Sequence, residues 1–562
     1  MKPTSSLTRF WLRAAPLLAL LVYSALAFYQ LALPGLYYDE ALDLPQAVQL
    51  ARGEPVVLMP KDPGVTVLGR TLPLMVIDYV GAVNTYLMTG VFAALGIGWF
   101  SIRWFEVAVG AVILALGVRL ARGWFGSSTA VVTGLLLAVS PSFLFWSRMG
   151  ISVTHVMAVA SLGSLVLIGR WARGGRQPGR LWLLFAAGLL LGLGVWAKLL
   201  FVWWWAALAA LHLTVNLERR WFTRAAWARG EIFGAPWQAW GAGALGVLVG
   251  AAPLVYYNAR TGETLALLQA AWSSPTSYGV NNLDFLANLG ARLSQFRVFL
   301  DGSYFWYNGG LHANSGALSL YLAAAAMVLY GFGEWTPARR RRGLAVLVVM
   351  LVVNVLGAFT VSGIWATHLY ILFPFPQMLA ALAVVALWRL RPDAAAWAWA
   401  GRLAAGVLAI TLAYGEARTT WDYHGDLTRT GGPGRFSDAI YALADYLDQN
   451  GVAAPAALDW GLEKNIYVLT GGRVQPAEIF GYSAEPDAGF RERVQALLCD
   501  GCVFLNVDAA YAVYPREAAF RQIAAEQGYV VAEAETVVFR ERSGQPAFFL
   551  YRVRDATGAA PR

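Results

Sequence analysis

Cysteine and charge are both scarce in this sequence, and each shortage excludes a class of protein. The 562 residues include only two cysteines, Cys499 and Cys502, too few for a disulfide framework or a four-cysteine metal site. Charged residues make up 14% of the chain and hydrophobic residues 58%, with a mean hydropathy of +0.51. A water-soluble protein could not bury this many apolar residues in a core of ordinary size with so few charged residues on its surface. We therefore expect an integral membrane protein.

The small excess of basic residues does not indicate nucleic-acid binding. The formal charge of +9 arises from 43 Lys and Arg against 34 Asp and Glu. These basic residues alternate with the apolar segments and form no single stripe, so they report membrane topology. No nucleic-acid partner is expected.

Apolar stretches long enough to cross a bilayer recur along the first three quarters of the chain. The first of them is too long for the apolar region of a signal peptide, roughly 7–15 residues, and no small-residue cleavage site follows it. By the criterion of roughly 20 apolar residues we expect about eleven spans. Their predicted ranges are 10–33, 104–121, 128–146, 153–170, 181–197, 199–216, 237–256, 317–334, 343–361, 368–388 and 398–415.

Clusters of Lys and Arg fall between these spans on one side only, which the positive-inside rule assigns to the cytoplasm. The clusters are Lys2, Arg9 and Arg13; Arg119 and Arg122; Arg170, Arg173, Arg176 and Arg180; Arg219, Arg220, Arg224 and Arg229; Arg339 to Arg342; and Arg389 and Arg391. An odd number of spans places the N-terminus in the cytoplasm and the C-terminal part outside it. We expect a plasma (inner) membrane protein with long outer loops at 34–103 and 257–316.

The composition becomes that of a soluble domain from about Glu416 onward. A glycine-rich segment, Gly431-Gly432-Pro433-Gly434, lacks the Lys-Ser/Thr of a phosphate-binding loop and indicates a flexible linker. Short apolar runs typical of buried strands then alternate with helical runs. The expected fold is a polytopic α-helical membrane protein with a small C-terminal extracytoplasmic α/β domain. Its predicted parts are a transmembrane domain, 1–416, a linker, 417–435, and the outer domain, 436–562.

Three carboxylates, Asp39, Glu40 and Asp43, stand just beyond the first span. Adjacent residues of a helix diverge by about 100°, so Asp39 and Glu40 would not face one target, whereas Asp39 and Asp43 could share a face. Pro45 can kink or restart such a helix. The alternative is structural: Asp39 caps a helix whose first turn carries acids that favour its dipole.

Cations and histidines also fall near the predicted outer face. Arg148 and Lys198 lie at span ends, where a charged side chain either has a function or extends to lipid headgroups, and the second reading is the one that we prefer for Arg103. Lys61 is a further functional candidate. The remaining candidates are His368 with Tyr370 for substrate, and His155 and His312 for a divalent metal, which the sequence permits but does not require because no zinc-ligand spacing is present.

Two other patterns have competing interpretations. The aromatic loop 272–306 either anchors the protein at the membrane interface or stacks on sugars or lipid tails, and we prefer the anchor. Cys499-Asp500-Gly501-Cys502 has redox-motif spacing, but its Asp-Gly pair indicates a turn that a disulfide can close.

The segment Tyr38-Asp39-Glu40 after a first span, the long outer loop, the many spans and the terminal outer domain together resemble the GT-C superfamily of glycosyltransferases. The resemblance is to the dolichyl-phosphate-mannose protein mannosyltransferases and the bacterial lipid A aminoarabinose transferase. Further segments that resemble family motifs are 79–87, 101–104, 140–149, 192–198 and 368–374. One departure is that 151–155 carries no acidic residue, so a metal site shared between two outer loops is in doubt.

The resemblance implies a membrane glycosyltransferase that moves a hexose or pentose from a polyprenyl-phosphate donor to an extracytoplasmic protein, lipid or polysaccharide, in contact with membrane lipids. Its sites would be Asp39 and Glu40 as catalytic residues, with Asp39 the base, and Asp43, Lys61, Arg148, Lys198, His368 and Tyr370 as substrate-binding residues. The alternatives are a transporter or lipid flippase and a non-catalytic glycan-binding relative. No inverted repeat is evident and the charges cluster at outer span ends, which favours interfacial chemistry.

Overall fold

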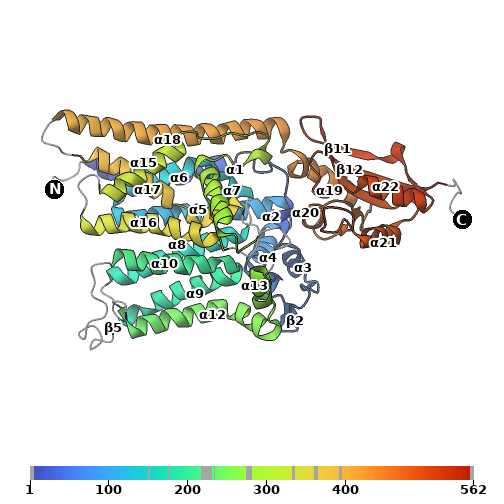
Figure 1. The fold of residues 1–562 in the computed structure, drawn as a ribbon, viewed down its shortest axis with the longest axis horizontal. Coiled ribbons are helices and arrows are strands. Elements are labelled where there is room, and N and C mark those ends of the chain that lie inside the picture. The colour runs from blue at the N-terminus through green and yellow to red at the C-terminus, as the bar shows by residue number, and fades with distance from the viewer. Residues whose placement is uncertain are drawn as a thin grey trace.

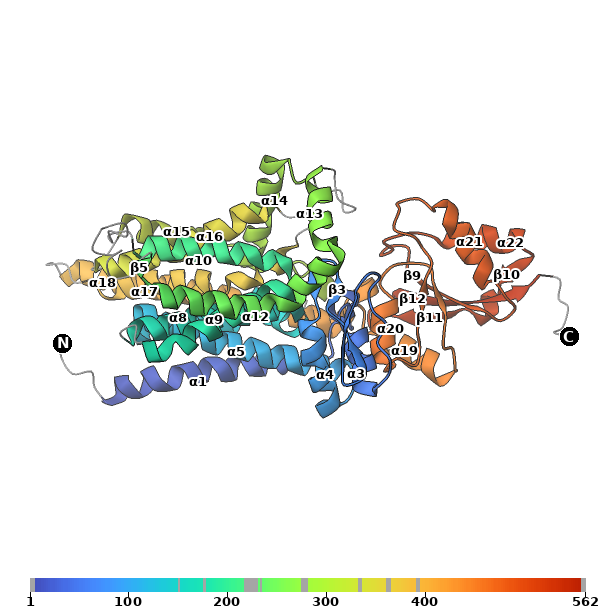
Figure 2. The same cartoon turned by 90° about the horizontal axis from the view of Figure 1, so that it is seen from below.

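The computed structural model of the chain describes residues 6–149, 152–174, 178–216, 231–232, 235–273, 281–331, 336–359, 365–390 and 395–556. Long helices run side by side in a bundle, and a smaller domain with a β-sheet adjoins one end of it (Figure 1). Helix α1, Ser6–Phe28, begins at the other end and leads toward this domain (Figure 2).

Every predicted span range contains helical residues. The helices are α1; α5, Trp99–Phe125; α6, Ser127–Val139; α7, Pro141–Met149; α8, Ser152–Arg173; α9, Leu181–Ala197; α10, Val202–Val215; α12, Trp237–Thr261; α15, Ala317–Tyr330; α16, Pro337–Gly357; α17, Phe375–Trp388; and α18, Ala395–Thr430. Of the described helices, four are long and apolar enough to cross a membrane, or up to six if two bent pairs each form one span. The count of eleven spans stays a prediction.

The two bent pairs break at proline. Helices α6 and α7 meet at 60° where Pro141 begins α7, and η4, Ala366–Leu372, meets α17 at 52° around Pro374. Proline donates no backbone hydrogen bond and disfavours a helical conformation in the residue before it. The first bend turns α7 inward, so that all nine of its residues are buried.

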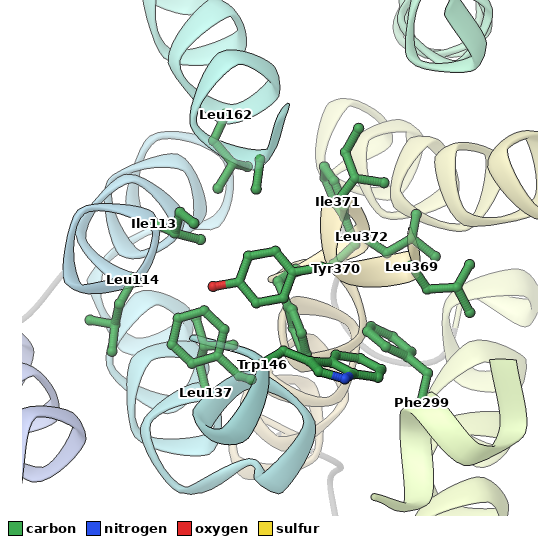
Figure 3. Packing of buried hydrophobic residues seen from close by; sticks show 14 of the residues in the cluster. Ile113, Leu114, Leu137, Trp146, Leu162, Phe299, Leu369, Tyr370, Ile371 and Leu372 are labelled. Carbon is green, nitrogen blue, oxygen red and sulfur yellow. The ribbon is translucent and has the colours of Figure 1, made fainter. Parts of the chain in front are cut away.

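Apolar side chains from most helices of the bundle form one continuous core. Figure 3 shows Tyr370 of η4 inside this core, among Ile113, Leu137 and Ile371. The aromatic loop contributes to the same core, because Phe305 is fully buried in it. The preferred reading of that loop as an interface anchor is therefore wrong for this ring.

The two long loops carry short elements of their own. They are α2, Tyr38–Ala41; α3, Pro45–Arg52; the hairpin of β1, Val65–Val67, and β2, Arg70–Leu72; the hairpin of β3, Met75–Ile77, and β4, Val80–Gly81; α4, Val83–Leu95; α13, Glu263–Ser273; and α14, Phe285–Asp301. Helices α2, α3, α4 and α13 lie at the bundle end that adjoins the C-terminal domain (Figure 1).

Two hydrogen bonds from arginines of the predicted basic clusters connect helix ends. Arg342 near the start of α16 donates to the carbonyl oxygen of Trp124 at the end of α5 at 2.8 Å, and Arg389 after α17 donates to the Ser128 hydroxyl at the start of α6 at 3.2 Å. These two basic clusters therefore lie at one end of the bundle. The predicted basic residues Lys2, Arg176, Arg219, Arg220, Arg224, Arg229 and Arg391 lie outside the described residues.

The C-terminal domain is built on a sheet with the strand order β10-β12-β9-β7-β8, with β11 paired to β12. Strand β7 is parallel to β8 and β9, and the other pairings are antiparallel. Its elements are α19, Ala439–Gln449; β7, Ala456–Ala457; α20, Glu463–Leu469; β8, Ala477–Glu478; α21, Ala488–Leu497; β9, Val503–Val507; α22, Glu517–Glu526; β10, Tyr529–Val531; β11, Val537–Arg540; and β12, Pro546–Asp555. A disulfide joins Cys499 and Cys502, as the turn permits.

The predicted linker 417–435 is wrong over most of its length, because α18 continues to Thr430. The buried face of this extension is largely polar, so a search for apolar residues misses its helical spacing of three and four. Its buried residues are Glu416, Thr419, Thr420, Tyr423, His424, Leu427 and Thr430. The glycine-rich turn that follows is also fixed by contacts: Gly434 donates to Glu541 at 2.7 Å.

Candidate active site

Asp39 lies within α2, the single helical turn that follows the first helix. Tyr37 is the N-cap residue, so the alternative in which Asp39 caps the helix is wrong. The Tyr37 hydroxyl donates to the Asp39 carboxylate at 2.5 Å. Burial raises the pKa of Asp39, and the nearby Tyr37, Lys198 and Arg435 offset part of this rise. A carboxylate with a raised pKa is a stronger base toward neutral pH.

Lys198 follows α9 and precedes the turn η2, Leu199–Phe201. Its Nζ lies 2.8 Å from Nε2 of His368, whose Nδ1 lies 3.1 Å from the carbonyl oxygen of Trp365. Because a carbonyl oxygen only accepts, Nδ1 carries the proton and Nε2 accepts from Lys198. Burial lowers the pKa of Lys198 to about 8. Lys198 and His368, predicted separately as substrate-binding residues, therefore form one pair.

Close packing against the long loop between α1 and α5 fixes the position of Lys198. Leu199 donates its backbone N–H to the carbonyl oxygen of Tyr79 at 3.0 Å, beside a bridge between Val80 and Lys198. A Cβ on Gly81 would lie 2.1 Å from the carbonyl oxygen of Trp196. Only glycine permits this approach.

Asp43 connects α2 with α4. Asn84 donates to the Asp43 carboxylate at 2.8 Å, and the Thr85 hydroxyl donates to the Asp43 backbone oxygen at 3.1 Å. Burial raises the pKa of Asp43 to about 6. Asp39 and Asp43 both act electrostatically on Lys198, yet among the described contacts neither forms an ion pair with it. The two acids therefore act on one cation, although Asp43 lies beyond the end of α2 and the predicted shared helix face is not formed.

Glu40, the neighbour of Asp39, is bound to Arg103. Nη2 and Nε of Arg103 lie 2.9 and 3.2 Å from the two carboxylate oxygens, and both side chains are fully buried. Arg103 also donates to the carbonyl oxygens of Leu31 and Gly35 at 2.9 and 3.2 Å. The expectation that Arg103 extends to lipid headgroups is wrong, because protein groups enclose and bind its guanidinium. The predicted catalytic Glu40 has its carboxylate engaged in this pair.

Arg148, predicted to bind phosphate, is also fully buried. It donates to the carbonyl oxygens of Tyr29 and Leu33 at 2.8 and 3.0 Å, and to that of Gln30. Two buried arginines thus hold the segment between α1 and α2 by its backbone. This segment leads directly into α2, which carries Asp39.

Two predicted substrate residues contact other groups. Lys61 is exposed and forms an ion pair at 2.8 Å with Glu263 at the start of α13. The Tyr370 hydroxyl lies 2.7 Å from that of Ser147, inside the core shown in Figure 3. Neither side chain joins the Lys198–His368 pair through a described contact.

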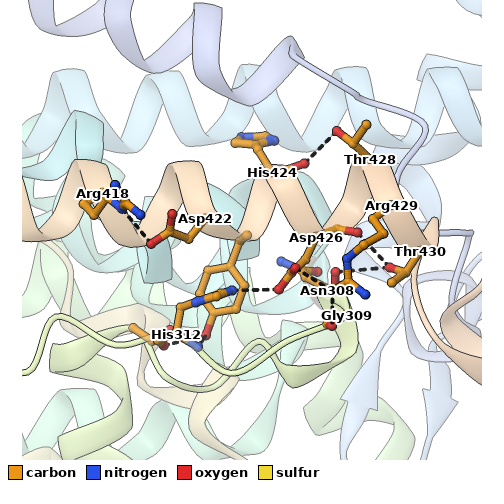
Figure 4. A network of polar contacts seen from close by, with 12 residues as sticks. Asn308, Gly309, His312, Arg418, Asp422, His424, Asp426, Thr428, Arg429 and Thr430 are labelled. Atoms are coloured by element: carbon orange, nitrogen blue, oxygen red, sulfur yellow. Dashed lines mark hydrogen bonds and ion pairs between the residues drawn. The ribbon is translucent and has the colours of Figure 1, made fainter. Parts of the chain in front are cut away.

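The two metal candidates lie against different partners. His312 is hydrogen-bonded at 2.7 Å to Asp426 of α18, which also binds Arg429 at 2.8 Å (Figure 4). His155 is buried with its ring 4.6 Å from that of Tyr370. Within the described ranges, no group of three or more His, Cys, Asp or Glu side chains could hold a metal ion. These residues do not fit such a centre.

The structure adds residues that the sequence did not single out. Arg435, at the entrance to the C-terminal domain, has its guanidinium 5.7 Å from the Trp460 ring and acts electrostatically on Asp39. Phe436 stacks on Tyr37 at 4.4 Å. The only sequence signal for these residues is that they follow the last predicted span, and this signal does not predict how the C-terminal domain is oriented against α2.

A small recess, part of it open to the surroundings, lies beside the Lys198–His368 pair. Its walls are mainly apolar, with Arg292 of α14 and His368 as the charged or ionisable members. Arg292 donates to the carbonyl oxygen of Gly357 at 3.1 Å. The apolar members are Met157, Leu200, Trp203, Trp204, Val353, Leu369 and Ile371.

No family model matches the sequence, and no curated protein matches it. Among solved structures, apo ArnT from Cupriavidus metallidurans matches with a TM-score of 0.56 and 13% identity, over 99% of this chain and 100% of that one. The undecaprenyl-phosphate-bound form of ArnT gives a TM-score of 0.54 and 13% identity, over 98% and 99%. The oligosaccharyltransferase AglB from Archaeoglobus fulgidus, with an inhibitory peptide and a dolichol-phosphate, gives 0.51 and 14%, over 90% and 70%.

ArnT is the lipid A aminoarabinose transferase, and both ArnT and AglB are members of the GT-C superfamily. The match includes the helical bundle and, for ArnT, nearly the whole of both chains. The resemblance predicted from the Asp-Glu segment and its context is confirmed: the chain has the fold of the GT-C membrane glycosyltransferases.

Proposed function

We propose that this protein transfers a monosaccharide from a polyprenyl-phosphate donor to an acceptor outside the cytoplasm. One observation carries the proposal: the Asp39 carboxylate, which accepts from Tyr37, and the Lys198 ammonium, which is bound to His368, each shift the pKa of the other, with no ion pair between them among the described contacts. Helix α2, which carries Asp39, lies at the bundle end that adjoins the C-terminal domain (Figure 1). Structures with this fold have been solved with undecaprenyl phosphate and with a dolichol-phosphate.

Asp39 is the proposed general base. The acceptor oxygen forms a bond to the anomeric carbon while the bond from that carbon to the phosphate oxygen breaks, and the electron pair leaves with the phosphate. Asp39 takes the proton of the acceptor hydroxyl. The hydrogen bond from Tyr37 orients its carboxylate. The phosphate is already a good leaving group, so no acid is needed on that side.

Lys198 and Arg292 are the proposed partners of the lipid phosphate. Positive groups fixed at the place where charge develops stabilise a transition state. Arg292 and His368 line the apolar recess, and Lys198 is bound to His368, so a phosphate at this mouth would leave the first isoprene units against apolar walls. Asp43, Glu40, Arg103 and Arg148 position the acidic segment in this proposal.

The pH dependence of turnover should identify Lys198. Asp39 must be ionised and has a raised pKa, so activity should rise with pH above the ordinary aspartate range. Lys198 must be charged, so activity should fall as pH rises through about 8. In Lys198→Arg the cation persists, and the falling limb of kcat/KM should move to higher pH. An unchanged falling limb would show that another group titrates.

The C-terminal domain is proposed to lie outside the cytoplasm and the turn before α9 inside it. In a Cys499→Ser, Cys502→Ser background, Ser543→Cys should react with an impermeant maleimide on intact cells, because Ser543 is exposed in the outer domain. Arg180→Cys should react only after the membrane is permeabilised. The reverse pattern would contradict this orientation.

The proposed activity itself is testable with purified protein and a synthetic polyprenyl-phosphate sugar. Free polyprenyl phosphate should appear together with a glycosylated acceptor. A folded protein that yields neither product would favour the transporter or glycan-binding alternatives.

A further inference from the structure

The loops that follow three strands of the C-terminal domain gather at one edge of its sheet. Strands β7, β8 and β9 are parallel, and β7 lies between the other two. The chain passes from β7 to β8 on one side and then to β9 on the other. In open α/β sheets, ligands bind outside the carboxyl ends of the strands where the strand order reverses in this way.

A buried aspartate joins the loops at this reversal. Asp459, which follows β7 and is fully buried, accepts from the backbone N–H groups of Val513 and Tyr514 at 3.0 and 2.7 Å. Its neighbour Trp460 has its ring 4.6 Å from that of Tyr38 in α2. This edge of the sheet therefore adjoins the residue next to Asp39, and Figure 1 shows α2 beside α20 at this junction.

A buried carboxyl oxygen lies at the same edge. Glu478 at the end of β8 accepts from the Tyr482 hydroxyl through one oxygen at 3.2 Å. Its other oxygen is buried and accepts no side-chain hydrogen bond in the described part of the chain, and the backbone of Gly461 is a polar neighbour of this carboxyl group. Tyr482 is 70% exposed, so an accessible ring stands beside the carboxyl group. Glu478 and Glu463 both act electrostatically on the Tyr38 hydroxyl.

We propose that this junction surface, formed by the exposed Tyr482 and the half-buried Trp460, Glu463 and Glu478 above the buried Tyr38, binds a saccharide portion of the acceptor. A sugar offers hydroxyl groups that can donate to the Glu478 carboxyl and a ring that can lie against aromatic side chains. The inference rests on the proposed function and specifies its acceptor: the bound sugar would present a hydroxyl to Asp39.

Two other ligand classes fit this surface less well. A cationic ligand is disfavoured because Arg435 already lies over the Trp460 ring at 5.7 Å and Lys464 pairs with Glu463 at 2.6 Å. A peptide added to the sheet edge is disfavoured because the edge strand β8 has only two residues. A hydroxyl-rich, neutral ligand remains.

Binding without donor tests the proposal independently of catalysis. Full-length protein in detergent would be applied to arrays of immobilised oligosaccharides, with a Ser/Thr-containing peptide array in parallel. We expect the wild-type protein to bind at least one oligosaccharide. The variants Trp460→Ala and Glu478→Gln should each raise the Kd about tenfold or more, which corresponds to a loss of about 1.4 kcal/mol of binding free energy. Trp460→Phe should retain most of the binding, and Glu492→Gln on the exposed face of α21 should bind like wild type.

Three results would overturn the proposal: binding to no oligosaccharide, oligosaccharide binding that these variants leave intact, or peptide binding that depends on the same residues. The binding assay contains no polyprenyl-phosphate sugar, so each of these results is independent of whether the protein transfers sugar. Conversely, absent transfer with intact, Trp460-dependent oligosaccharide binding would contradict only the proposed function.

Discussion

Asp39→Asn should lower kcat for sugar transfer by about 10²–10⁴-fold, the range expected when a general base is removed. The amide keeps the size of the side chain and can still contact Tyr37, but it cannot take the acceptor proton. The apparent affinity for the lipid donor should change little, because the phosphate contacts are assigned to Lys198 and Arg292. Initial rates at saturating donor and acceptor, with donor titrations, measure both quantities.

A matched control comes from another aspartate on the same side of the fold. Asp422 of α18 pairs at 2.9 Å with Arg418, which is 62% exposed, and Asp422→Asn should leave kcat unchanged. If both Asp39→Asn and Asp422→Asn keep the wild-type kcat, Asp39 is not the base. Equal large losses in both would indicate a nonspecific effect of removing charge.

Arg103→Leu should lower the free energy of unfolding by about 3–5 kcal/mol, because it leaves the Glu40 carboxylate buried without its partner. Both members of this pair are fully buried. The substitution also removes the donors to the Leu31 and Gly35 carbonyl oxygens, so kcat should fall as Asp39 loses its position. Thermal unfolding and turnover of the purified protein measure the two effects.

An exposed ion pair provides the comparison for Arg103. Arg473 binds Asp448 at 2.7 Å with 58% of its side chain exposed, so Arg473→Leu should cost less than about 1 kcal/mol. The double variant Arg103→Leu, Glu40→Leu should recover part of the lost stability, since no charge is then left unpaired. Equal destabilisation by Arg103→Leu and Arg473→Leu would argue against a buried pair.

The sequence predicted the elements whose signals are local. Long apolar runs located the helices, and the composition change after the last of them located the C-terminal domain. The acidic segment was found because three carboxylates at a membrane exit are unusual, and Lys198 because a cation at a span end requires an explanation. Each of these inferences needed only neighbouring residues.

Long-range pairings could not be predicted in the same way. Arg103 gives the same sequence signal whether it reaches lipid headgroups or binds Glu40, and only the folded chain brings these two together. The sequence around Trp460 gives no signal of its contact with Tyr38, because the orientation of the C-terminal domain depends on many contacts at once. The extension of α18 was missed for a different reason: its buried face includes Thr419, Thr420 and His424, which an apolar pattern ignores.

The most direct test of the central claim uses purified protein in lipid nanodiscs with synthetic polyprenyl-phosphate sugars and a candidate acceptor, followed by mass spectrometry of both products. The account predicts equal amounts of free polyprenyl phosphate and glycosylated acceptor from wild type, and neither above background from Asp39→Asn. Unaltered donor with every sugar tested, from wild-type protein shown to be folded, would contradict it.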